Sequence, residues 1–245
     1  MTRAFVARIV ASCTLLSCTL LSCTEGLPSE PTTAVDRGRA LFASTASSPS
    51  SINPFSCSSC HVTTETPAND RALPGAPLGG VTKRTTYWGG KVDDLLVAVN
   101  ACRTSFMTSP TTWIATDSDA RDLFAYLDTL PGSGNLARFT FVESTALPPA
   151  GDKGSGAALY ARTCANCHGD KSTANGRTAP RAPAIPDQVN TEHNYLTPAD
   201  RRTVFVEKVR HGPFLGYGGN MPPFSAEALS DADLGAILAY LGIYD

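Results

Sequence analysis

Apolar positions in the middle of the chain repeat with a helical period. Side chains three or four positions apart form one apolar face, which a cysteine continues: Val92, Leu95, Leu96, Val99 and Cys102. This spacing predicts an amphipathic helix. Shorter helices are predicted over residues 35–42 and 154–160, and acidic starts predict helices at the ends of segments 107–127 and 221–241. These elements predict an all-α fold.

The chain contains an internal repeat. Starting at Met107, the first copy reads MTSPTTWIATDSDARDLFAYL, and starting at Met221, the second reads MPPFSAEALSDADLGAILAYL, aligned without a gap. Each copy places a methionine in a loop ahead of a helix. The repeat predicts two tandem domains, residues 35–131 and 153–245. Prolines and glycines predict a linker over residues 132–152 between them.

The first residues have the features of an export signal. Arg3 and Arg8 flank no acidic residue, and the apolar run Ile9 to Ser22 is too short to span a membrane comfortably, so residues 1–22 are predicted to be a signal peptide. Leu20-Leu21-Ser22-Cys23 resembles the bacterial lipoprotein signal, in which the cysteine is lipidated after cleavage.

The same lipoprotein pattern occurs once more at Leu15-Leu16-Ser17-Cys18, although cleavage there would leave a short apolar core. A further alternative is a periplasmic protein whose signal peptide merely contains cysteines. We expect export to the periplasmic side of a bacterial membrane, with a lipid anchor at Cys23. Residues 23–34 are then anchor and tether, rich in proline and polar residues.

The charge balance excludes some partners. The chain has 20 basic and 22 acidic residues and a formal net charge of −2. Loss of Arg3 and Arg8 with the signal peptide would make the mature chain more negative. The sequence therefore predicts no nucleic-acid partner and no anionic membrane surface as a partner.

Two C-x-x-C-H motifs carry the chemistry, Cys57 to His61 and Cys164 to His168. This motif signals covalent attachment of c-type haem: two thiols bind the porphyrin and the adjacent histidine ligates the iron. A structural zinc site would place its cysteine pairs about 15 to 20 residues apart, and these lie far further apart. A thioredoxin-like motif would need a strand before it, whereas helices are predicted here.

The cysteine count then leaves one residue over. Of eight cysteines, two lie in the signal peptide, Cys23 would carry lipid, and Cys57, Cys60, Cys164 and Cys167 would hold haem. Cys102 remains without a role.

Both halves resemble class I c-type cytochrome domains, and the resemblance covers nearly all of residues 35–245. It implies two small helical domains around two covalent haems, with His61 and His168 as proximal iron ligands. In such domains a proline carbonyl orients the proximal histidine, and the matching positions are Pro77 and Pro183. Ordinary loop punctuation is the alternative for both prolines.

Met107 and Met221 are the expected distal ligands. The chain has three methionines, one of them the initiator, and the other two occupy equivalent repeat positions. A thioether opposite the histidine gives a six-coordinate iron with a raised reduction potential. The alternative for each is an ordinary core-filling methionine.

Cys102 competes with Met107 for the first iron. Thiosulfate dehydrogenases resemble this arrangement, with a distal cysteine at about this distance from the first motif, but a buried structural cysteine is the simpler interpretation. His193 and His211 are expected to be surface histidines rather than ligands. Trp88 and Trp113 are expected to pack on the first haem, to bond a propionate, or simply to fill the core.

These features predict a dihaem carrier of single electrons between periplasmic or membrane-bound redox proteins, rather than an enzyme. Oxidation of a small sulfur compound at the first haem, as in thiosulfate dehydrogenases, is the alternative. A docking module of a larger oxidase or dehydrogenase is a third possibility.

Overall fold

The regular structure consists of helices. The computed structural model describes residues 33–66, 72–135, 147–185, 197–214 and 219–243. Within these residues the elements are α-helices and short 3₁₀ helices, with one isolated β-bridge between Tyr87 and Val92 and no strand. The prediction of an all-α fold agrees with this architecture.

The N-terminal half is built from three α-helices, α1 (Ala34–Ala43), α2 (Leu95–Ser105) and α3 (Ser118–Asp128). Four 3₁₀ turns lie between them: η1 (Thr45–Ser47), η2 (Cys57–Ser59), η3 (Val81–Lys83) and η4 (Trp88–Gly90). Side chains cap two of these helices. Thr33 accepts a hydrogen bond from the Asp36 amide at the start of α1, and Asp94 accepts one from the Val97 amide at the start of α2.

The C-terminal half contains α4 (Lys153–Thr163), α5 (Ala165–His168), α7 (Pro198–His211) and α8 (Asp231–Leu241). Asp152 caps α4, Thr197 forms a capping box with Asp200 ahead of α7, and Ser230 caps α8. The local sequence thus contains the capping residue of each of these three helices.

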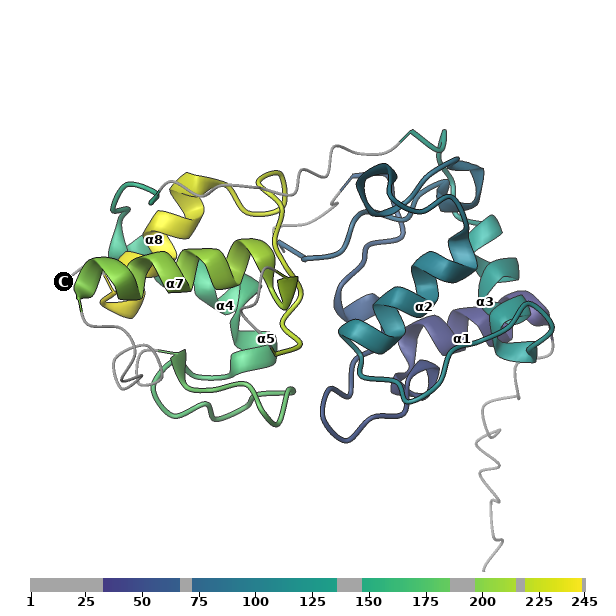
Figure 1. Cartoon of the computed structure of the whole chain (residues 1–245), viewed down its shortest axis with the longest axis horizontal. Helices are drawn as coiled ribbons and strands as arrows, with labels where there is room; N and C mark the ends of the chain where they lie inside the picture. The colour runs from purple at the N-terminus through teal and green to yellow at the C-terminus, as the bar shows by residue number, and fades with distance from the viewer. Residues whose placement is uncertain (1–32, 67–71, 136–146, 186–196, 215–218, 244–245) are drawn as a thin grey trace, which may run out of the picture. The chain divides into compact units, whose positions relative to one another are not determined.

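Two separate hydrophobic cores hold these helices. In the first, α1 packs on α3, and in the second, α4 packs on α8 (Figure 1). The first core is formed by Phe42, Val81, Tyr87, Ala98, Leu123, Tyr126, Leu127 and Leu130. The second includes Leu159, Tyr160, Phe205, Val206, Leu234, Ile237, Leu238 and Leu241.

A glycine permits the helix crossing in each core. A Cβ added to Gly38 would lie 1.9 Å from the carbonyl oxygen of Asp122, and one added to Gly156 would lie 2.0 Å from that of Ala236. The ungapped repeat alignment places Asp122 on Ala236. The same backbone contact therefore occurs twice at equivalent positions.

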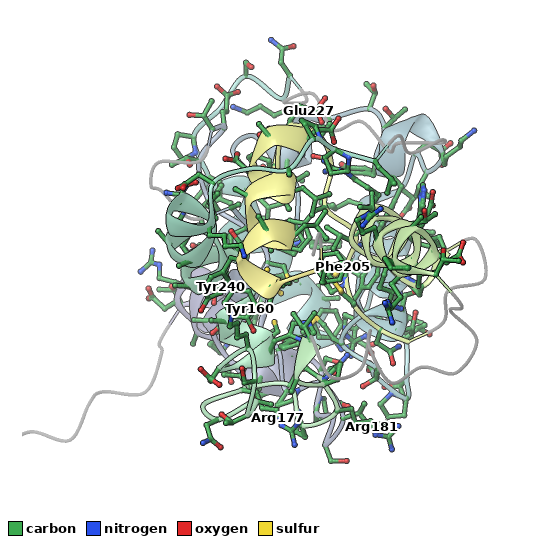
Figure 2. The ribbon with its side chains drawn as sticks, turned by 90° about the vertical axis from the view of Figure 1, so that its left-hand side faces the viewer. Tyr160, Arg177, Arg181, Phe205, Glu227 and Tyr240 are labelled. Carbon is green, nitrogen blue, oxygen red and sulfur yellow. The ribbon has the colours of Figure 1, made fainter. Side chains whose placement is uncertain are left out.

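An aromatic pair lies beside each crossing. Phe42 and Tyr126 have ring centroids 5.5 Å apart. Tyr160 and Tyr240, which Figure 2 labels, have theirs 5.7 Å apart. Phe42 and Tyr160 each stand four residues after the crossing glycine of their helix. One packing arrangement of the first and last helix thus serves both halves.

The predictions for the N-terminal segment lie largely outside the described residues. The predicted signal peptide, Cys23 and residues up to 32 are among those not described, as is part of the predicted linker. Residues 31–245 form one compact unit, so the division into two domains stays a prediction that rests on the repeat and the two cores. In the part of the chain described, no helix has the length and hydrophobicity to cross a bilayer.

Candidate functional site

The first C-x-x-C-H motif lies on the 3₁₀ turn η2. Ser56 and Ser59 form a capping box across this turn, and the amides of Cys60 and His61 both donate to the Cys57 carbonyl, at 3.1 and 3.0 Å. Residues three apart on a 3₁₀ turn lie on one side, which brings the Cys57 and Cys60 thiols together.

The second motif lies on the short helix α5 and forms the same backbone hydrogen bonds. The amides of Cys167 and His168 donate to the Cys164 carbonyl, at 3.1 and 3.0 Å. The two motifs therefore share their local backbone bonds. None of their cysteines forms a disulfide.

A backbone carbonyl orients each motif histidine. His61 Nδ1 lies 2.7 Å from the carbonyl oxygen of Ala76, and His168 Nδ1 lies 3.1 Å from that of Pro183. Because a carbonyl can only accept, Nδ1 carries the proton and Nε2 is left to ligate a metal. Burial lowers the pKa of both histidines, which favours the neutral, metal-binding form.

The expected role of Pro77 is corrected by this geometry. The acceptor for His61 is Ala76, while the Pro77 carbonyl accepts from the Arg84 guanidinium at 2.6 Å. The acceptor stands 15 residues after the histidine in both halves. A carbonyl acts through its backbone position, so this spacing, rather than a proline, is the signal that identifies it. Pro183 is at the expected position.

A cavity that is partly open to solvent adjoins the first motif. Cys57, Cys60 and His61 line it, and its walls are mainly apolar. The apolar lining includes Val81, Leu95, Val99, Phe106, Leu123 and Leu127. An apolar cavity beside two thiols and an oriented imidazole fits a covalently held haem.

Both candidate distal ligands line this cavity. Met107 is 3% exposed and packs with Phe55, and Cys102 borders the same small cluster. Burial, followed by the nearby Cys57, raises the pKa of the Cys102 thiol to about 12. Without a metal, Cys102 is therefore a neutral thiol at physiological pH. The geometry brings both sulfur atoms to one site.

Arg84 adds a group that the sequence did not reveal. Its guanidinium lines the cavity and donates to the carbonyls of Pro77 and Gly79, but its buried Nε atom has no partner. An unpaired buried cationic N–H is costly unless an anion meets it. A haem propionate would supply that anion, so Arg84 is a residue that would hold the group.

The two tryptophans have different surroundings. Trp88 lines the cavity, but its indole N–H donates to the Ala98 carbonyl at 3.2 Å. The Trp113 ring lies against the Arg103 guanidinium, 3.7 Å from ring centroid to Cζ. Trp88 is therefore a packing residue of the cavity, and Trp113 supports Arg103.

Met221 packs against the second core, as does Cys164. Gly212, directly after α7, has φ +59°, and a Cβ there would lie 2.3 Å from the Met221 carbonyl oxygen. The methionine loop thus passes against backbone that only glycine allows.

The histidine expectations have different outcomes. His211 is 5% exposed and therefore buried rather than at the surface, and its Nε2 lies 2.8 Å from Glu207 Oε2 one turn earlier on α7. The side chain faces inward on the helix that packs into the second core, which overrides the polar character of histidine. His193 lies outside the described residues.

Comparison with known proteins identifies the second half. Residues 151–241 match the family model described as Cytochrome C oxidase, cbb3-type, subunit III. No curated protein matches the chain significantly. The matched segment, which contains the second motif and Met221, is a c-type cytochrome domain. This implies covalently bound haem c and supports a role in electron transfer.

Proposed function

We propose that the chain is a dihaem electron carrier, with one haem c on Cys57 and Cys60 and a second on Cys164 and Cys167. The observation that supports this is that one arrangement occurs twice. In each motif the amides of the second cysteine and the histidine donate to the carbonyl of the first cysteine, and the histidine side chain bonds a carbonyl 15 residues later. The family match covers only the second copy, so the first haem rests on this equivalence.

The proposed iron ligands are His61 with Met107 and His168 with Met221. Haem c supplies a one-electron redox couple when bound. If these four side chains hold the two irons, no coordination site would be left for a substrate, and the haems would supply electron transfer alone. The protein's part is to hold the histidine tautomers, exclude water with apolar walls, and pair the propionate with Arg84.

Redox proteins are the proposed partners, at the periplasmic side of a bacterial membrane. Leu20-Leu21-Ser22-Cys23 supports an exported chain anchored by a lipidated Cys23. Such an anchor would keep the haem-bearing part next to membrane-bound donors or acceptors.

Haem content tests the proposal directly. Protein exported together with a cytochrome c maturation system should carry two covalent haems, retained in acidified acetone and counted by the pyridine haemochrome assay. Cys57→Ala with Cys60→Ala should leave one. A wild-type content of one haem would overturn the dihaem assignment, and the double variant would then show whether the second motif alone is used.

A second function is favoured by one observation: Cys102 lines the same cavity as Met107. If a thiolate ligates the first iron, oxidation of a small sulfur compound becomes the better assignment for that haem.

A further inference from the structure

A serine-rich segment separates α1 from the first motif. It has no counterpart in the second half, where α4 ends directly before Cys164. Polar residues of this segment are nonetheless buried: Ser47 and Ser48 are 0% exposed and Asn53 is 6% exposed. Buried polar groups need hydrogen-bond partners. Residues 47–53, here called the strap, find theirs in a distant part of the chain.

The strap bonds three consecutive residues of the methionine loop. Asn53 Nδ2 donates to the Phe106 carbonyl at 2.7 Å, and Ser48 Oγ donates to the carbonyl of Met107 at 3.3 Å. Ser50 Oγ shares a short hydrogen bond with Thr108 Oγ1. The backbone on both sides of the Met107 side chain is thereby fixed to the strap.

Arg103 ties the strap and the loop to α2. Its Nε donates to the Ser47 carbonyl at 2.9 Å, and its terminal nitrogens donate to the Thr111 carbonyl and the Ser109 hydroxyl, each at 3.2 Å. Arg103 is 3% exposed. One buried cation therefore connects the strap, the helix before Met107 and the loop after it.

The loop conformation requires such support. Thr108 has φ +53°, in the left-handed region that a β-branched residue rarely adopts. Such a conformation persists where surrounding contacts determine it. The bond from Ser50 to the Thr108 hydroxyl is a contact of this kind.

We propose that the strap positions Met107 as distal ligand of the first haem, with Ser48 and Asn53 as positioning residues. The proposal rests on the His61/Met107 ligation proposed above. The second half meets the same need differently: the buried Arg210 donates to the carbonyls of Phe224 and Ser225, and Gly212 admits the loop. Loss of strap bonds should therefore affect the first haem alone.

The test uses the full dihaem protein and the variants Ser48→Ala and Asn53→Ala, singly and together. Imidazole, which competes with methionine for iron, is the probe. In the double variant the first haem should bind imidazole about tenfold more tightly, equivalent to about 1.4 kcal/mol. Its methionine-to-iron charge-transfer absorption should weaken and its potential should fall, while the second haem stays unchanged. Ser51→Ala, at an exposed serine of the same strap, is the matched control.

One further variant separates the possible failures. Met107→Ala should remove the charge-transfer absorption of the first haem; if it does not, the ligand assignment is wrong and the strap proposal falls with it. If Met107→Ala acts as expected but the strap variants bind imidazole like wild type, the strap proposal alone is overturned. Ser48→Ala removes one oxygen only, so it tests the proposal even if Asn53→Ala fails to fold.

Discussion

At the residue scale, two sulfur atoms are candidate ligands for the proposed first iron. Cys102 and Met107 line the same cavity, and burial raises the pKa of the Cys102 thiol to about 12, so a thiolate there would need the metal to stabilise it. Met107 needs no deprotonation, and the strap already holds its loop.

We therefore expect Met107→Ala to lower the potential of the first haem and to make its iron high-spin or open to another ligand. Cys102→Ala should cause only a modest loss of packing, about 1 kcal/mol. Redox titration with visible and paramagnetic resonance spectra measures both. The reverse pattern, a raised potential in Cys102→Ala and an unaltered Met107→Ala, would favour the thiolate, and assays with thiosulfate would follow.

Individual residues also show what sequence reasoning could reach. The motif cysteines and histidines are identified by their fixed spacing, and Pro183 by its distance from His168. Ala76 could not be identified from the sequence, because any residue type can provide a backbone carbonyl as acceptor. The proline expected at this place, Pro77, stands directly beside it. Arg84 was missed because only the fold shows that its Nε atom is buried and unpaired.

At the scale of elements, the crossing of first and last helices is set by one glycine in each half. Gly156→Ala should destabilise the second half by about 2 kcal/mol, because the new methyl group would lie 2.0 Å from the Ala236 carbonyl oxygen and must push α4 from α8. Thermal unfolding measures the change.

Gly154→Ala on the same helix is the matched control. The nearest atom to its added Cβ is the end of the flexible Asp152 side chain at 3.1 Å. Because alanine favours helix over glycine, this variant should be neutral or more stable by up to about 1 kcal/mol. Equal destabilisation by both variants would show that the crossing is not the cause.

An ion pair joins α1 to α3 in the first half. Arg37 bonds both carboxylate oxygens of Asp122, at 2.6 and 2.9 Å, and this bond lowers the pKa of Asp122. A lowered folded-state pKa stabilises the protein above the unfolded value of about 3.9 and ceases to do so as pH falls through the folded value.

Asp122→Asn should therefore unfold at a lower temperature than wild type at pH 7, and the gap should close as pH falls below about 4. Thermal unfolding across this pH range measures it, with Asp93→Asn, at an exposed aspartate ahead of α2, as control. A gap independent of pH would mean that the ion pair does not contribute.

The start of α2 depends both on a capping residue in the local sequence and on a contact with another segment. The apolar face predicted from Val92 onward is helical only from Leu95, because Asp94 caps α2 and Val92 pairs with Tyr87 in a bridge. The cap could have been found in the sequence, but the bridge could not. The sequence does not indicate which residues the serine-rich insertion contacts, because its buried hydrogen bonds reach residues more than 50 positions away.

The whole molecule combines two cores with an N-terminal segment whose role rests on sequence. The helices of both cores repeat one geometry, so most of the fold follows from recognising the repeat. The proposed attachment to a membrane would depend instead on Leu20-Leu21-Ser22-Cys23, ahead of α1, which begins at Ala34. The membrane anchor and the haem sites should therefore be separable.

Cys23→Ser should release the protein from membranes and leave its haem content and spectra unchanged, because the residues that form both haem sites all lie beyond α1 or within it. Lipidation provides the attachment in this proposal, and no described helix could replace it. Fractionation of membranes, followed by haem staining of each fraction, measures the change, and Cys18→Ser is the control for the alternative cleavage position. Release by Cys18→Ser instead would move the anchor to that cysteine, and a wild-type protein found wholly in the soluble fraction would contradict lipid anchoring altogether.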